Sequence, residues 1–203
     1  MSIRAVYFDL GGVLLRTEDR APRTQLAESL GLTYEAIERI VHGGGPDGSA
    51  AQASIGQLTE QQHWQNVAHA LHLPEDDIRR VETAYFSGDR LDETLVAFIR
   101  ALRPQRRTGL ISNAWSGLRA WIVSHNFDDA FDSMTISAEV GCGKPDPRIY
   151  ELALGKLDVP PAQAIFVDDV PANVDAADAL GMHGIVFRQA GQVMAEINRL
   201  LAS

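Results

Sequence analysis

Polar residues stand at the ends of three short apolar runs in the sequence, and a lysine lies in a loop rich in glycine and proline, GCGKPDP. These residues are Asp9, Ser112, Asn113, Asp168, Asp169 and Lys144. Acidic side chains can hold a divalent cation, and a cation, an ammonium group and a hydroxyl can together hold a phosphate. A carboxylate can also attack an electrophilic centre as a nucleophile. The residue types therefore indicate chemistry on a phosphate group, provided that the fold brings them together.

The apolar runs before these residues have the length of buried strands. They are Ala5–Phe8, Thr108–Ile111 and Ala164–Val167. Two further runs, Met134–Ile136 and Gly184–Phe187, continue an alternation with helical segments that predicts a parallel sheet covered on both faces. Ligands bind beyond the carboxyl ends of the strands in such sheets, so we expect the polar residues at one edge. Capping and turn formation can explain any one of them, but not the whole set.

Amphipathic segments predict the helices that cover this sheet. They are Leu91–Leu102, a helix near Trp115–Ser124, a helix capped by Asp146 with Pro147 in its first position, Ala172–Leu180 and a C-terminal helix. Trp115 is interpreted as a core residue of its helix, and the alternative is that it forms one wall of a substrate pocket.

The stretch between the first two apolar runs does not follow this alternation. It is far longer than one crossover requires and predicts several helices without strands. One helix begins with a capping box at Thr59, and Pro74 opens another. We therefore predict a Rossmann-like α/β core formed by residues 1–15 and 88–203, with an α-helical cap inserted at residues 16–87.

The composition of the chain limits which classes of function the protein can have and where in the cell we expect it. The net charge of −9 over 203 residues argues against a nucleic-acid partner, because phosphate backbones need clustered basic residues. The apolar runs are too short to cross a membrane, and the N-terminal residues do not resemble a signal peptide. A single cysteine, Cys142, excludes an internal disulfide and fits a reducing compartment. We expect a cytoplasmic protein, and no feature of the sequence assigns an oligomeric state.

Four sequence motifs, in this order and spacing, resemble those of the haloacid dehalogenase superfamily. They are FDLGGVLL, LISNA, GKPDPRIY and FVDDVPANVDAADALGM. The resemblance covers the whole chain and is strongest to the helical-capped phosphatases, which include the phosphatase domain of soluble epoxide hydrolases and sugar-phosphate phosphatases. It implies a Mg²⁺-dependent phosphatase of small phosphorylated metabolites, with sugar phosphates among the candidate substrates.

The resemblance also implies a role for each residue of the motifs. Asp9 would be the nucleophile that becomes an aspartyl-phosphate, and Lys144 would neutralise both Asp9 and the phosphate. Ser112 and Asn113 would bind the transferring phosphoryl group. Three groups would bind Mg²⁺, and two residues would stand behind them. The metal ligands would be Asp9, Asp169 and the backbone carbonyl of Gly11, with Asp168 as an acid behind them and Asn173 where many relatives carry another acid.

Gly11 is the departure from the family pattern that matters most. Most relatives have an aspartate there, which protonates the leaving group and later activates water, and glycine can do neither. Its carbonyl can still bind a metal, and related capped phosphatases with the sequence DLG act on sugar phosphates. If another residue supplies the proton, Glu18 or a cap histidine such as His42 is the place to look.

Similar residue types occur in three classes of protein other than phosphatases. Haloacid dehalogenases work without a metal and also lack the second aspartate, but their fourth motif is less acidic than Asp168-Asp169, a pair that would repel Asp9 without a cation. Receiver domains use the same residue types in a different order along the chain, which excludes them. A phosphate-binding protein without turnover remains open because of Gly11.

Overall fold

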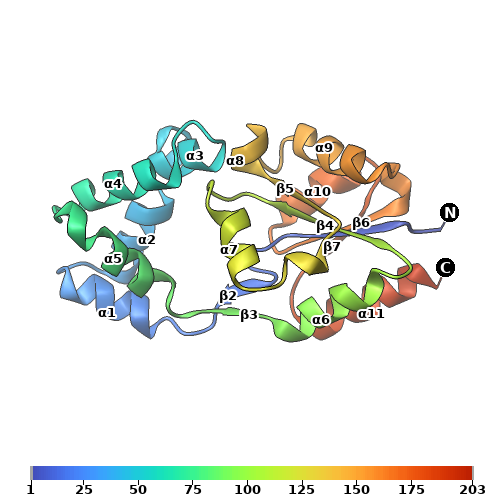
Figure 1. Cartoon of the computed structure of the whole chain (residues 1–203), viewed down its shortest axis with the longest axis horizontal. Helices are drawn as coiled ribbons and strands as arrows, with labels where there is room; N and C mark the ends of the chain where they lie inside the picture. The colour runs from blue at the N-terminus through green and yellow to red at the C-terminus, as the bar shows by residue number, and fades with distance from the viewer. Residues whose placement is uncertain (1, 203) are drawn as a thin grey trace.

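The computed structural model describes residues 2–202, and it has two lobes joined by a narrow ribbon (Figure 1). One lobe is built around a parallel sheet and carries both ends of the described chain, whereas the other consists of helices. The strands of the sheet, in chain order, are β1 (Ala5–Phe8), β4 (Arg107–Ser112), β5 (Ser133–Ile136), β6 (Ala164–Asp168) and β7 (His183–Val186). They lie in the order β5-β4-β1-β6-β7, and all are parallel. The sequence prediction of a parallel α/β sheet is confirmed.

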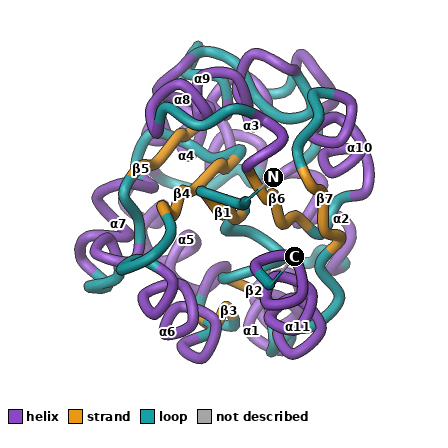
Figure 2. Tube along the Cα trace, turned by 90° about the vertical axis from the view of Figure 1, so that its right-hand side faces the viewer, coloured by secondary structure: helices purple, strands orange, loops and turns teal. Residues whose placement is uncertain are grey.

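Helices cover both faces of this sheet (Figure 2). One face is covered by α6 (Glu93–Leu102), α7 (Leu118–Ser124) and α11 (Ala190–Leu201). The other face is covered by α9 (Pro147–Leu157) and α10 (Pro171–Ala179), and the short α8 (Ser137–Val140) follows β5. The 3₁₀ turns of this lobe are Asp128–Ala130 and Pro161–Gln163.

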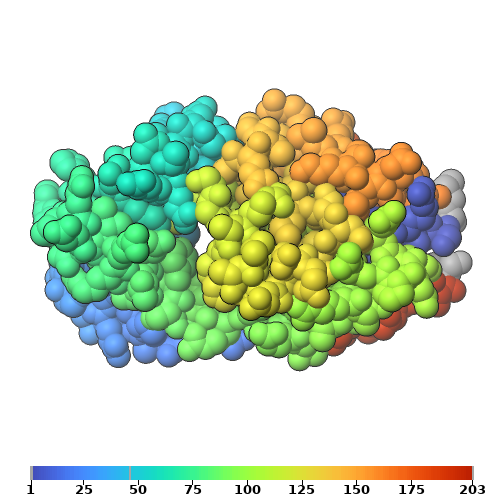
Figure 3. Space-filling model, viewed as in Figure 1, coloured from blue at the N-terminus to red at the C-terminus, as the bar shows by residue number. Residues whose placement is uncertain are grey.

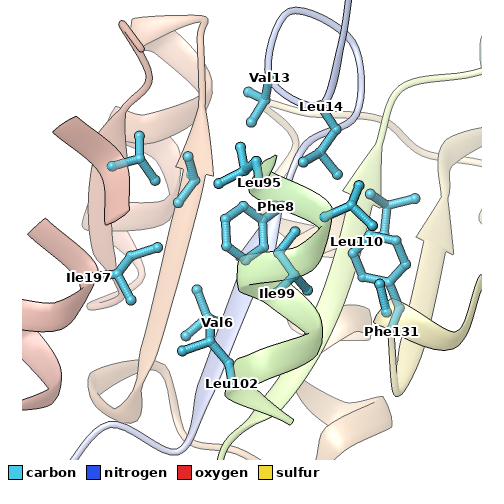
Figure 4. Packing of buried hydrophobic residues seen from close by; sticks show 14 of the residues in the cluster. Val6, Phe8, Val13, Leu14, Leu95, Ile99, Leu102, Leu110, Phe131 and Ile197 are labelled. Atoms are coloured by element: carbon cyan, nitrogen blue, oxygen red, sulfur yellow. The ribbon is translucent and has the colours of Figure 1, made fainter. Parts of the chain in front are cut away.

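The central strand β1 supplies apolar side chains to both layers. Val6 and Phe8 point into the layer that contains Leu110 and Ile99 (Figure 4), whereas Tyr7 packs among the residues of the opposite layer. The hydroxyl of Tyr7 donates a hydrogen bond of 3.0 Å to the carbonyl of Ala153 in α9. Burial on both faces explains why the strand is continuously apolar instead of alternating.

The helical lobe has its own hydrophobic core. Its helices are α1 (Ala21–Ser29), α2 (Tyr34–His42), α3 (Ser49–Ser54), α4 (Glu60–Ala70) and α5 (Ile78–Phe86), with 3₁₀ turns at Gly45–Asp47 and Glu75–Asp77. Side chains such as Leu26, Ile37, Val67 and Val81 pack against each other there. The predicted capping box is present, because the Thr59 side chain accepts the N–H of Gln62 and the Gln62 side chain accepts the N–H of Thr59. None of the helices within residues 2–202 combines the length and the apolar character that a bilayer crossing demands.

Two short strands that the sequence did not indicate form the ribbon between the lobes. Strand β2 (Leu15–Thr17) pairs antiparallel with β3 (Asp89–Leu91). Asp92 follows β3 and accepts the N–H of Leu95 at 2.9 Å, so α6 begins at Glu93, two residues later than predicted. Three-residue strands carry too little periodicity to be recognised in a sequence.

Candidate active site

The carboxyl ends of β1, β4 and β6 meet at the edge of the sheet that faces the helical lobe (Figure 1). Asp9 follows β1 directly, and its N–H donates to the carbonyl of Val167 at 2.9 Å. Ser112 and Asp168 are the last residues of β4 and β6. Parallel pairing therefore brings together three residues that are far apart in the sequence, as predicted from the strand ends.

Lys144 lies at the centre of this edge and joins two of the acids. Its Nζ is 2.8 Å from Asp9 Oδ1 and 2.6 Å from Asp168 Oδ2, and its side chain is almost completely buried. The loop that carries Lys144 is fixed by Asn113, whose Oδ1 accepts the N–H of Lys144 at 2.7 Å and whose Nδ2 donates to its carbonyl at 2.8 Å. Both side-chain atoms of Asn113 are therefore engaged in positioning Lys144.

Both carboxylate oxygens of Asp168 are occupied by hydrogen bonds. Oδ1 accepts the N–H of Val170 at 2.8 Å and Nδ2 of Asn173 at 3.1 Å. Oδ2 accepts Nζ of Lys144 and, at 3.1 Å, the same Asn173 amide. Asn173 is in turn held by Tyr150, whose hydroxyl donates to the Asn173 carbonyl at 2.8 Å. Asp168 therefore orients Lys144 and has little capacity left for another ligand.

Asp169 differs from its neighbour, because its carboxylate accepts no hydrogen bond from another residue in the described part of the chain. The residue as a whole is exposed, but partial burial of its carboxyl group and the charge of Asp168 raise the pKa of that carboxyl above its usual value. Asp9, Asp168 and Asp169 each offer a carboxylate oxygen, and these oxygens lie within 4.8 Å of one another. Closely spaced hard oxygen donors are the set that Mg²⁺ prefers.

Burial also perturbs Asp9. Desolvation raises the pKa of its carboxyl to about 6, although the ammonium group of Lys144 and the Leu10 N–H, at 2.7 Å from Oδ1, oppose the rise. The charge of Asp168 adds to the rise. A cation beside Asp9 and Asp169 would relieve this repulsion, so the residues present fit a divalent metal.

The two glycines after Asp9 have different structural requirements. Gly12 has a φ of +78°, and a Cβ atom there would collide with the carboxylate of Asp169, so only glycine is compatible with that position. Gly11 does not have a positive φ, and a Cβ atom built on it meets nothing within 4 Å. The backbone at Gly11 therefore tolerates a side chain, and glycine there is not required for the turn.

A cleft of about 1430 Å³ lies between the two lobes and opens onto this edge of the sheet (Figure 3). The sheet lobe contributes Gly11, Ser112 and Asn113 to its walls, and the helical lobe contributes Trp64 and Phe86. The hydroxyl of Ser112 forms no hydrogen bond with residues 2–202, so it is available to a ligand. A substrate in this cleft would lie between the strand ends and the helical lobe.

The sequence prediction for Trp115 was right only in its alternative, a wall of the pocket, and Ser137 was not singled out. Trp115 does not belong to a helix, because α7 begins at Leu118; its side chain packs against the helical lobe instead and also lines the cleft. Ser137 was not predicted to be a site residue. It is buried directly after β5, and its hydroxyl accepts the N–H of Ala114 at 3.0 Å. Ser137 could have been predicted from the sequence, because it is a polar residue at the carboxyl end of a fourth strand.

Comparison with protein families agrees with this architecture. The haloacid dehalogenase-like hydrolase family matches residues 3–181. The chain therefore belongs to this family, and it is a hydrolase by membership.

Three related proteins show how the chain compares with individual members. Bifunctional epoxide hydrolase 2 of Sus scrofa is 29% identical over 98% of this chain, which spans 39% of that protein's length. A sesquiterpene phosphatase of Aspergillus oryzae is 26% identical over 98% of this chain and 97% of its own. The crystal structure of a family enzyme from Bacteroides thetaiotaomicron, in complex with magnesium and inorganic phosphate, superposes with a TM-score of 0.78 at 22% identity over 94% of this chain and 96% of its own. The last similarity shows the fold.

Proposed function

We propose that this protein is a Mg²⁺-dependent phosphatase that hydrolyses small-molecule phosphate monoesters through an aspartyl-phosphate on Asp9. The observation that carries the proposal is the position of Lys144, whose Nζ lies 2.8 Å from Asp9 Oδ1 at the edge that also holds Ser112 and Asp169. A nucleophilic carboxylate and a fixed cation then lie at the same strand ends as a free hydroxyl that lines the cleft. The names of the related sesquiterpene phosphatase and of the structure with magnesium and phosphate support the same activity.

In the proposed reaction, a carboxylate oxygen of Asp9 attacks phosphorus, and the bond from phosphorus to the leaving oxygen breaks. The leaving group departs with the electron pair of that bond and takes a proton from water or from a group in the cleft. Water then attacks the phosphorus of the aspartyl-phosphate, which releases inorganic phosphate and a proton and regenerates Asp9. Lys144 neutralises charge on the nucleophile and on the transferring group throughout.

The other residues at the edge have supporting roles in this proposal. Ser112 donates to a phosphate oxygen, and Asn113 contributes by holding Lys144 as well as by lining the cleft. Mg²⁺ would be held by Asp9, Asp169 and the Gly11 carbonyl, and when bound it neutralises phosphate charge. Asp168 and Asn173 stand behind these ligands and orient Lys144.

The helical lobe acts as a cap in this proposal, with residues 16–87 as the cap and residues 1–15 and 88–203 as the core. Its separate hydrophobic core and the two crossings paired in the β2–β3 ribbon support these boundaries. The cap would close over the substrate by bending near Leu14–Thr17 and Gly88–Leu91, which excludes bulk water from the aspartyl-phosphate. Hydrogen exchange of the cap, measured with and without a phosphate analogue, tests the closure.

A screen of phosphate monoesters tests the proposed activity. Purified protein is assayed for released inorganic phosphate on aryl, sugar and alkyl phosphates, with Mg²⁺ and with EDTA. We expect release that needs Mg²⁺ and is lost in Asp9→Asn. Halide release from 2-haloacids that persists in EDTA would instead support a haloacid dehalogenase, and phosphate binding without any turnover would support a protein that only binds phosphate compounds.

A further inference from the structure

The loop from Asn113 to Gly117, between β4 and α7, is fastened to both lobes. Its first half contacts the sheet lobe. Asn113 holds the main chain of Lys144 through two hydrogen bonds, and the N–H of Ala114 donates to Ser137 Oγ at 3.0 Å. These contacts fix the residues that directly follow the phosphate-binding hydroxyl of Ser112. The position of this half of the loop therefore sets the geometry at the end of β4.

The second half of the loop contacts the helical lobe through Trp115. The indole Nε1 donates to the carbonyl of Ala50 in α3 at 3.3 Å. The indole ring lies with its centroid 4.2 Å from the ring of His63 and 5.5 Å from that of His42, and it is stacked on His42 with an interplanar angle of 25°. Trp64 and Phe86 meet it edge-on at 5.9 and 6.5 Å.

The two residues after Trp115 approach the same lobe closely. Ser116 Oγ accepts the N–H of Glu60, the first residue of α4, at 3.3 Å. Gly117 lies against the carboxylate of Glu60, and a Cβ atom on Gly117 would collide with it. Three consecutive loop residues thus contact α3 or α4, whereas the hydrogen bonds that side chains make with the two residues before them, within residues 2–202, all go to the sheet lobe.

We infer that Trp115 is a positioning residue that couples the helical lobe to the phosphate-binding end of β4. If the helical lobe moved away from the sheet lobe, Trp115 would lose its contacts with α2, α3, α4 and α5. Only two residues separate Trp115 from Ser112, so a displacement of Trp115 would also displace Ser112. Conversely, a phosphate held by Ser112 and Lys144 would stabilise the loop that presents Trp115 to the lobe. The inference rests on the proposed function for the identity of the ligand, but the contacts themselves do not depend on it.

The aromatic contacts of Trp115 determine how strongly it holds the helical lobe against the sheet lobe. Each aromatic pair contributes beyond the burial of its area, so removal of the indole should shift the equilibrium between closed and open lobes by roughly tenfold or more. Because binding and closure are linked, the same substitution should weaken phosphate binding by a similar factor.

Hydrogen exchange followed by mass spectrometry tests the coupling in Trp115→Leu, Trp115→Phe and a matched control. Trp121→Leu serves as the control, because Trp121 lies on the adjoining helix α7 and also lines the cleft, but its aromatic partners within residues 2–202, His125 and Phe127, belong to the sheet lobe. Circular dichroism first establishes that each variant is folded. We expect exchange of the α4 amides to rise about tenfold in Trp115→Leu, to rise less in Trp115→Phe, which keeps a ring but loses the N–H, and to stay unchanged in Trp121→Leu.

Addition of inorganic phosphate and Mg²⁺ shows whether Trp115 couples phosphate binding to the helical lobe or only packs against that lobe. In the wild-type protein, phosphate should slow exchange in α4 as well as around Ser112, whereas in Trp115→Leu the protection should be confined to the sheet lobe. Equal phosphate-dependent protection of α4 in both proteins would overturn the inference. A wild-type α4 that does not respond to phosphate would overturn it as well.

Steady-state kinetics then separate this inference from the proposed function. With a phosphate ester that the wild-type protein hydrolyses, KM should rise about tenfold in Trp115→Leu, and Trp115→Phe should recover most of the loss. If the wild-type protein hydrolyses no phosphate ester, the proposed function fails, while the exchange of α4 still decides whether Trp115 holds the lobe. An unchanged KM together with unchanged exchange in Trp115→Leu would refute the coupling alone.

Discussion

The strand-end cluster and the face of the helical lobe opposite it bury polar groups in different ways. At the strand ends, both oxygens of Asp168 and the ammonium group of Lys144 are engaged by partners on other elements. In the lobe, the buried Nε1 of Trp64 and Nε2 of His63 have no hydrogen-bond partner within the described chain. Because an unpaired buried polar group costs free energy, this part of the lobe face is less tightly specified than the Lys144–Asp168 pair at the strand ends.

The helical lobe is not loosely built throughout. At its base, the guanidinium of Arg23 is bound by Asp89 of β3 at 2.8 Å and by Glu38 of α2 at 3.0 Å, and its Nε donates to the carbonyl of Tyr85 at 2.9 Å. Asp89 also accepts the hydroxyl of Thr17 at 2.7 Å, so both strands of the ribbon join this network. Because the Arg23 network fixes the end of the lobe next to the ribbon, the lobe can move as a rigid body. The side chains that face the cleft can still adjust to a bound ligand.

The largest effect is expected from Asp9→Asn, which removes the proposed nucleophile with almost no change in the size of the side chain. An amide cannot form the acyl-phosphate, so kcat should fall by about a thousandfold or more. Release of inorganic phosphate measures the loss, and thermal unfolding checks that the fold is intact. Turnover that remains within tenfold of wild type would show that Asp9 is not the nucleophile.

The next effect concerns Gly11, which in the proposed mechanism leaves Asp9 without a general acid beside it. Such a group contributes about 10²–10⁴ in rate, so leaving groups that tolerate negative charge should react fastest. Aryl phosphates should therefore exceed primary alkyl phosphates in kcat/KM, which reports the proposed transfer of the phosphoryl group to Asp9. Gly11→Asp should narrow this ratio by about a hundredfold.

We expect Gly11→Asp to leave the backbone unchanged, because Gly11 has no positive φ and there is space for a Cβ atom. Gly12→Asp provides the contrast, since a side chain there would collide with Asp169 and should cost stability. If kcat/KM of the wild-type protein is independent of the pKa of the leaving group, another residue supplies the proton. His42, which lines the cleft, would then be the first residue to replace.

A third prediction separates the two adjacent acids. Asp169→Asn should raise the Mg²⁺ concentration needed for half-maximal activity by up to about a hundredfold, because its carboxylate accepts no hydrogen bond from another of residues 2–202. Asp168→Asn should change the Mg²⁺ requirement less and lower thermal stability more, since it leaves Lys144 without one of its two buried carboxylates. Titrations of both variants with Mg²⁺ give the order, and a larger metal effect at Asp168 would reverse the assignment.

The sequence predicted the strand ends well because their chemistry coincides with strong local patterns. Asp9 and Asp168 end apolar runs, and Asp146 caps a helix that begins with Pro147, as expected. The position of Ser112 at the end of β4 also agrees with its prediction. Parallel pairing then brings these residues together without any further information from the sequence.

The ribbon and the lobe face could not be predicted from local patterns. The helix expected from Trp115 begins three residues later, because the Trp115 side chain contacts residues of the helical lobe that are distant in the sequence. The pairing of Arg16 with Arg90 in the ribbon places two cations side by side, which no rule of strand pairing favours. It is tolerated because Arg16 turns toward Asp92, at 2.9 Å. Such contacts depend on tertiary structure and produce no periodic pattern in the sequence.

The last prediction is that acid loosens the helical lobe through His63. This residue is fully buried in α4, its Nδ1 is 2.9 Å from Ser49 Oγ, and its ring lies against Trp115. Burial, with a smaller contribution from His42, lowers the pKa of His63 from 6.5 to about 4. Between pH 6.5 and 4 the folded lobe therefore binds fewer protons at this site than the unfolded chain does.

The direction of the effect follows from this difference in proton binding. The stability that the neutral imidazole provides is complete above pH 6.5 and is lost as the pH falls toward 4, by about 2 kcal/mol at pH 5. Hydrogen exchange in α4 should accelerate over this range in the wild-type protein, and the acceleration should be much smaller in His63→Gln, which cannot take up the proton. His69→Gln, at an exposed position on the same helix, is the matched control and should keep the wild-type profile. A pH profile that is the same in all three proteins would mean that the lobe face tolerates a buried charge as well as the strand ends do, and the contrast between the two regions would then be wrong.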